Sequence, residues 1–235
     1  MIRILVHPGF HKTGTTSLQR MLQANHDRLG PGIHVALRED MTAVAETARA
    51  YSVRQDPVEL ALFRGLLAAF LAKLRLQDGE TLILSSEDLC GHMPGRRGVT
   101  SYAAAPELMR CLAEVAEELI GDPLRLEFLF TTRAPRDWLE SLHGHLADRG
   151  AIAADLGDFS ASVAGAEALG DIVDAVAEAV APWPVHRAPL ERSAARPFGP
   201  LAPVLDLLGL DDDARKRLVE LPPANSRDRT RRPPS

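Results

Sequence analysis

The 235-residue sequence has little cysteine and few aromatic residues: two cysteines, Cys90 and Cys111, and 5% Phe, Trp and Tyr. The two cysteines stand apart from each other and from any dense group of histidines, so we expect neither a disulfide scaffold nor a structural zinc site. Both are expected to be small buried side chains. The remaining composition, 46% apolar and 25% charged, is that of an ordinary globular protein and excludes disorder of the whole chain.

An excess of basic residues is also absent, because the formal net charge is -5 and the isoelectric point is about 5.9. Proteins that bind nucleic acid normally present a dominant basic face, so we expect no nucleic-acid partner. Long apolar runs are missing as well, and each apolar stretch is too short or too interrupted by charge to span a bilayer. The chain starts without the features of a signal peptide, which makes the cytoplasm the expected location.

Short apolar runs alternate with amphipathic segments along the chain. Strands are expected at residues 2–7, 81–85, 125–131 and 185–190. Helices are expected at residues 15–25, 39–50, 57–76, 106–120, 135–146, 166–180, 203–208 and 211–221. This alternation predicts a three-layer α/β fold with a central parallel sheet flanked by helices. One domain is expected over residues 1–221, followed by a basic, poorly ordered tail at residues 222–235.

The segment after the first expected strand reads HPGFHKTGTTSLQR at residues 7–20. A buried strand that delivers a glycine-containing turn into a helix N-terminus favours anion binding, because unpaired N–H groups and the helix dipole point at the ligand. Gly9 and Gly14 have the spacing of a P-loop, but Thr15 stands where nucleotide hydrolases carry lysine. The lysine lies instead at Lys12, inside the loop, which disfavours an ordinary kinase or GTPase.

The loop KTGTTSL at residues 12–18 resembles the 5'-phosphosulfate loop of the sulfotransferases that use 3'-phosphoadenosine 5'-phosphosulfate. A second match is RAPRDWLES, in which Arg133 and Ser141 are similar to that family's 3'-phosphate pair. The resemblance is strongest over residues 2–25 and 124–146. It implies a P-loop-like fold and transfer of a sulfuryl group to a hydroxyl or amine of a carbohydrate or small metabolite. Adenosine 3',5'-bisphosphate is the product, and no metal is required.

The resemblance also implies a role for each matched residue. The donor would be held by Lys12, Thr13, Gly14, Thr15, Thr16, Ser17, Arg133 and Ser141. As a compact cation, Lys12 would stabilise charge on the bridging oxygen while the bond to sulfur breaks. The C-terminal R-K-G and G-D-W-K type segments of the animal cytosolic members are missing here. Either Arg227 or Arg229 in the tail could replace them, or the tail is simply frayed and basic.

Three residues are candidates for the base that takes the acceptor's proton. Glu87 is the first choice, because TLILSSEDL places it at the carboxyl end of an expected strand. His11 in the loop and His92 in the Gly-rich segment 91–102 are the other two. Alternatively, Glu87 or Asp88 caps a helix or forms an ion pair with Lys12 or Arg133.

Two other functions stay open on the sequence alone: a P-loop kinase or nucleotide hydrolase, and a non-catalytic nucleotide-binding protein on the same scaffold. Arg96 and Arg97 would either meet an anionic acceptor or be solvated. No pattern in the sequence indicates the oligomeric state. Outside the reaction itself, we expect a buried, hydrogen-bonded His7, a core Trp138, and His143 and His145 facing solvent or adenine.

Overall fold

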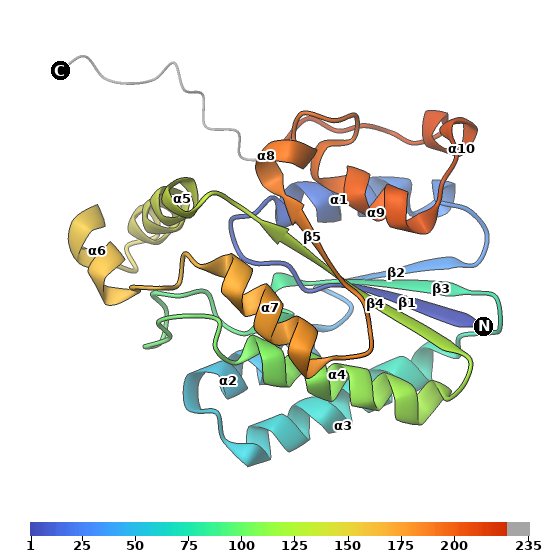
Figure 1. The fold of residues 1–235 in the computed structure, drawn as a ribbon, viewed down its shortest axis with the longest axis horizontal. Coiled ribbons are helices and arrows are strands. Elements are labelled where there is room, and N and C mark those ends of the chain that lie inside the picture. Colours follow the sequence, from blue (N-terminus) through green and yellow to red (C-terminus); the bar gives the residue numbers. More distant parts are fainter. Residues whose placement is uncertain (225–235) are drawn as a thin grey trace.

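The fold is built on one sheet of five parallel strands in the order β2-β3-β1-β4-β5 (Figure 1). This computed structural model describes residues 1–224 of the chain. The strands are β1 (Ile2–His7), β2 (Ile33–Leu37), β3 (Thr81–Ser85), β4 (Leu124–Thr132) and β5 (Val185–Pro189). β1 is the middle strand, and its register places His7 beside Ser85 of β3 and Val6 beside Phe128 of β4.

Helices cover both faces of this sheet (Figure 1). One face packs on α1 (Thr15–Asn25) and α9 (Ala202–Leu208), and the other on α2 (Thr42–Arg54), α3 (Pro57–Leu74), α4 (Ala105–Ile120) and α7 (Leu169–Ala179). Side chains alternate along β1, so Ile4 and Val6 enter the second layer of helices while Leu5 enters the first. The predicted three-layer α/β fold with a parallel sheet is confirmed.

The remaining helices lie at the ends of these layers. α5 (Pro135–Asp148) and α6 (Leu156–Ser162) stand beyond the carboxyl ends of the strands (Figure 1). The short helices α8 (Leu190–Ser193) and α10 (Asp212–Lys216) flank α9 in sequence. Three 3-10 helices complete the set: η1 (His26–Arg28), η2 (Glu87–Cys90) and η3 (Gly199–Leu201). Within residues 1–224, no helix has both the length and the apolar character needed to cross a bilayer.

The sequence missed one strand, β2 (Ile33–Leu37). Within residues 1–224 it is an edge strand that pairs with β3 alone, and two of its five residues, Ala36 and Leu37, are buried. Its pattern therefore lacks the continuous apolar run of a strand buried on both faces. As a result, residues 81–85 form the third strand of the chain and not the second.

Several helix boundaries also differ from the prediction. α2 begins at Thr42 and ends at Arg54, later than the predicted 39–50. α10 covers Asp212–Lys216, only part of the predicted 211–221. By contrast, α3 begins where predicted, because the Asp56 side chain accepts the Val58 N–H at 2.8 Å. Most of the tail, Arg227 and Arg229 included, lies outside the described residues.

Candidate active site

The predicted site residues gather at the carboxyl edge of the sheet. Residues 8–14 follow β1, Glu87 follows β3 and Arg133 follows β4. In open parallel sheets, ligands bind in the crevice outside the carboxyl ends of the strands. The start of α1, the start of α5 and the short helix α8 surround this edge (Figure 1).

The loop at residues 8–14 has a backbone that only a few sequences tolerate. Gly14 caps α1 with φ 96° and supplies no side chain to the first turn, which contains no acidic residue. An added Cβ on Gly14 would lie 2.8 Å from Leu190 Cδ1 and 3.2 Å from Pro200 Cγ, at a φ that side chains rarely adopt, so a larger residue would be strained there. Lys12 also adopts a left-handed conformation, with φ 70°. The N–H groups at the start of α1 thus fit an anion.

A chain of buried polar side chains connects the loop to the strands by hydrogen bonds. The Thr13 hydroxyl donates to the Phe10 carbonyl at 2.7 Å and lies 2.7 Å from the Thr131 hydroxyl. His7 Nε2 is 3.4 Å from the same Thr131 oxygen, and its Nδ1 is 2.8 Å from Ser85 Oγ. These contacts tie the loop to the ends of β1, β3 and β4. Thr13 is therefore a structural residue of the loop.

His7 is neutral in this network. The residue is fully buried, and burial lowers the pKa of its imidazole to about 3. The predicted buried and hydrogen-bonded His7 is confirmed. A neutral ring can accept at one nitrogen and donate at the other, which two hydroxyl partners require.

His11 is held by contacts on both ring nitrogens. Nδ1 lies 3.0 Å from the Tyr102 hydroxyl, and Nε2 lies 3.4 Å from Asp88 Oδ1. The backbone is fixed too, because the His11 N–H donates to Tyr102 and its carbonyl accepts the Trp138 indole N–H at 2.9 Å. Only 7% of His11 is exposed. Trp138 is buried as predicted, while Tyr102 is a site neighbour that no pattern in the sequence indicated.

Asp88 is a buried carboxylate that two arginines share. Arg49 Nη1 lies 2.6 Å and Arg38 Nε lies 2.9 Å from Asp88 Oδ2. Burial alone would raise the pKa of Asp88, but His11 and the two arginines hold it below the usual value. Asp88 thus forms ion pairs, but the arginines that the structure places against it are Arg38 and Arg49 and not the expected Arg133.

Glu87 is the first residue of η2 and is only partly buried. Its Oε2 accepts the Gln19 side-chain N–H at 2.9 Å, and Gln19 lies on α1 just beyond the loop. Glu87 therefore has a fixed position beside α1, directly after β3.

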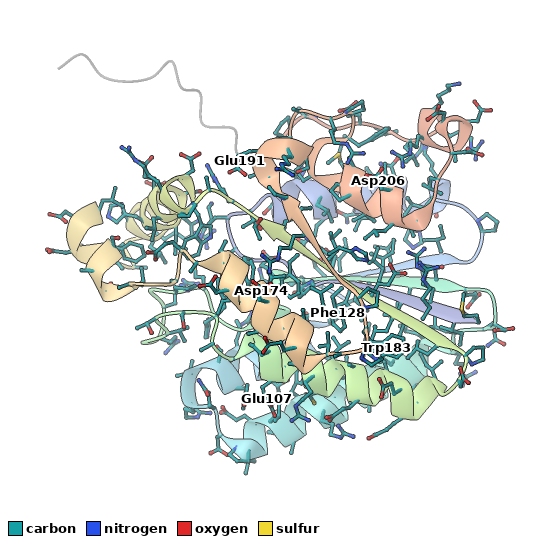
Figure 2. The ribbon with its side chains drawn as sticks, in the orientation of Figure 1. Glu107, Phe128, Asp174, Trp183, Glu191 and Asp206 are labelled. Atoms are coloured by element: carbon teal, nitrogen blue, oxygen red, sulfur yellow. The ribbon has the colours of Figure 1, made fainter. Side chains whose placement is uncertain are left out.

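Arg133 bridges the two segments that the sequence singled out. Its Nη1 donates to the Lys12 carbonyl at 3.3 Å, across 121 positions of sequence. Ser141 is partly buried about two turns into α5. At the start of α5, the Ala134 N–H donates to Glu191 Oε1 of α8 at 2.8 Å, and Figure 2 shows Glu191 at this edge.

His145 of α5 lies in a strongly positive environment. Burial first, and then Lys12 and other nearby cations, lower the pKa of His145 to about 4. The influence of Lys12 places this part of α5 beside the loop. His92 lies nearby with its backbone N–H bonded to Ser52 Oγ at 2.9 Å, and burial followed by Arg49 lowers its pKa as well.

No protein-family model matches this sequence, and no curated protein matches it either. Among solved structures, the chain is similar to a sulfotransferase from Alicyclobacillus acidocaldarius. The identity is 15% and the TM-score is 0.48, over 91% of this chain and 87% of that one.

Proposed function

We propose that this chain is a sulfotransferase that uses 3'-phosphoadenosine 5'-phosphosulfate and acts on a hydroxyl or amine. The observation that carries the proposal is the contact between Arg133 and the Lys12 carbonyl. Each residue belongs to a segment that resembles one phosphate-binding element of that family. A donor with phosphates at both its 5' and 3' positions requires two such elements to meet at one place.

The residues present fit this donor. The start of α1 offers N–H groups and no acidic side chain, so a 5'-phosphate meets no repulsion there. The partly buried Arg133 guanidinium can fork onto a 3'-phosphate, and the Ser141 hydroxyl can add a donor. Bound there, the donor supplies an activated sulfuryl group. Thr15 and Ser17 are buried and shape the turn, whereas the hydroxyl of exposed Thr16 is available to ligand.

In the reaction, we assign charge stabilisation to Lys12 and proton abstraction to Glu87. As the acceptor oxygen or nitrogen bonds to sulfur, the bond from sulfur to the bridging oxygen breaks, and that oxygen gains negative charge. The Lys12 ammonium stabilises this charge, and Glu87 takes the acceptor's proton. Adenosine 3',5'-bisphosphate is the leaving product.

We assign His11 a positioning role. Both of its ring nitrogens have partners, Tyr102 and Asp88, so neither nitrogen stands ready for an acceptor proton. The same contacts fix the loop beside Lys12. This arrangement favours Glu87 as the base.

Thermal or denaturant unfolding with adenosine 3',5'-bisphosphate tests the proposal. At 100 times its dissociation constant, the ligand should add about 2.7 kcal/mol to the free energy of unfolding. Arg133→Gln should weaken this effect, while Arg136→Gln, whose side chain is 90% exposed and pairs with Glu140, should not. Folded protein that shows no shift at millimolar bisphosphate would refute donor binding. A shift with ATP and Mg²⁺ alone would point to the kinase or hydrolase alternative.

A further inference from the structure

Helix α3 is apolar around its whole circumference, although only one side of it is buried. Its inner side contributes Phe63, Leu67 and Leu71 to the core. On the outer side, every exposed residue from position 57 to position 72 is apolar: Pro57, Val58, Ala61, Leu62, Gly65, Leu66, Ala69 and Ala72. A surface helix normally places polar residues on its outer face. This outer stripe of α3 therefore indicates a face that another apolar surface covers.

Large exposed apolar side chains concentrate on the outer stripe. Val58 is 66%, Leu62 is 53% and Leu66 is 37% exposed. They are three of the eight large apolar residues that are exposed in residues 1–224. Because they stand four positions apart, they form one row along the helix. Figure 1 shows α3 at the outer border of the molecule, where this row is open to a partner.

The middle of the outer stripe has the shape to receive a copy of itself. Gly65 stands at the centre of the 18-residue helix, and an added Cβ on it would have open space. Consider two antiparallel copies of α3, related by a two-fold axis that passes between positions 65 and 66. Leu66 of each copy then lies opposite Gly65 of the other, and Leu62 lies opposite Ala69. A large side chain faces a small one in both pairs, which allows the two helices to interdigitate.

The two ends of α3 carry opposite charges. Asp56 precedes the first turn, whereas Lys73 and Arg75 stand at the last. The ion pair between Arg54 and Glu59 is neutral overall and leaves Asp56 as the net charge of the first end. Under the same two-fold axis, Asp56 of each copy lies opposite Arg75 of the other. A second copy of the chain therefore matches both the stripe and the charges at its ends.

We propose that this chain forms a symmetric dimer in which the outer stripes of two α3 helices pack antiparallel. The inference is independent of the proposed function, because no residue of the stripe belongs to the candidate active site. One helix from each copy gives a contact below the about 800 Å² per partner of a standard interface. The dimer should therefore be weak, with a dissociation constant of about 10–100 μM.

Sedimentation equilibrium of the full chain over a range of concentrations, up to about 500 μM, tests the dimer. The average mass should rise from 25.5 kDa toward twice that value. Leu62→Glu places a charge in the contact and should raise the dissociation constant at least about 10-fold. An unchanged melting temperature shows that this variant is folded, as expected for a side chain that is 53% exposed.

Leu156→Glu is the matched control, because Leu156 is 39% exposed but begins α6. It should dimerise as the wild type does. A mass that stays at 25.5 kDa at every concentration would overturn the inference, and so would a Leu62→Glu variant that dimerises as tightly as the wild type.

Cysteine crosslinking tests the antiparallel arrangement. A chain with both Leu62→Cys and Ala69→Cys should form a disulfide-linked dimer under mild oxidation, because the axis sets these positions opposite each other. Leu62→Cys alone should not, since seven residues, about 10 Å of helix, separate position 62 from its copy. Cys90 and Cys111 are buried and do not compete. Crosslinking by Leu62→Cys alone, or none by the double variant, would refute the antiparallel dimer.

Discussion

Among single residues, Lys12 is the one whose substitution should change turnover most specifically. The lysine sits at positive φ in the loop, with its carbonyl bonded to Arg133 and its charge close enough to depress the pKa of His145. Lys12→Ala should lower turnover by about 10²–10³-fold, because one group that stabilises transition-state charge is lost. Initial rates with a labelled donor measure this, and an unchanged melting temperature shows that the fold is intact.

Lys73→Ala is the control for this prediction. Lys73 lies in the last turn of α3, away from the carboxyl edge, and its removal takes away the same charge. Its turnover should match the wild type. If Lys12→Ala has the same turnover as the wild type, a group other than Lys12 stabilises the charge.

Two substitutions distinguish the roles of Glu87 and His11. Glu87→Gln keeps the shape and the contact with Gln19 but removes the base, so turnover should fall by about 10²–10⁴-fold with little change in stability. His11→Ala removes the partner of Tyr102 and Asp88, so its main effect should be a lower free energy of unfolding. Rates and denaturant curves on both variants provide the comparison. A Glu87 variant with full activity would return the role of base to a histidine.

At the scale of elements, the turn from β1 into α1 depends on Gly14. Gly14→Ala forces a Cβ to within 2.8 Å of Leu190 Cδ1 at φ 96°, so it should both destabilise the fold and weaken donor binding. Gly79→Ala is a matched control, since Gly79 has φ 88° but open space around an added Cβ. Both variants share the backbone strain. The difference between their free energies of unfolding therefore reports the contacts with Leu190 and Pro200.

Elements with strong local signals were predictable. β1 is a continuous apolar run, and α3 has an N-capping aspartate followed by proline, so both begin where the sequence places them. β2 was missed, because a half-exposed edge strand has a weak pattern of its own and forms by pairing with β3. Local propensity therefore predicts an element only where the element's own residues form a clear apolar or capping pattern.

At the scale of the whole molecule, His7 makes stability depend on pH. Its pKa is about 3 in the folded protein and about 6.5 when unfolded, so the unfolded state binds more protons between these values. The free energy of unfolding should therefore fall as pH drops below 6.5, with a slope from this group approaching 1.4 kcal/mol per pH unit. Its contribution is fully present above pH 6.5.

His7→Gln should flatten this dependence. Denaturant unfolding at pH 7, 6 and 5 on the wild type and the variant gives the difference in slope. His26→Gln is the control, because the His26 side chain is 54% exposed and pairs with its exposed neighbour Asp27. A His7 variant that retains the full wild-type slope would show that protonation of other groups causes the loss.

The order of the strands decides which charges meet. Arg38, Glu87, Lys12 and Arg133 follow four different strands, and the order β2-β3-β1-β4 sets them side by side along one edge. Nothing local to Arg38 indicates that it contacts Asp88, which is 50 positions later in the chain. The contact between Arg38 and Asp88 exists only through this long-range arrangement.

Local patterns in the sequence were enough to predict the parallel α/β class, the turn from β1 into α1, and the buried state of His7, Trp138 and the two cysteines. These follow from local patterns of apolar residues, glycine and proline, whose physics acts over a few positions. The sequence did not predict three long-range contacts: Arg133 with the Lys12 carbonyl, His11 with Tyr102 and Asp88 through its two ring nitrogens, and Asp88 with two arginines. Such contacts join residues far apart in the chain, so they depend on strand order and packing, which no short stretch of sequence encodes.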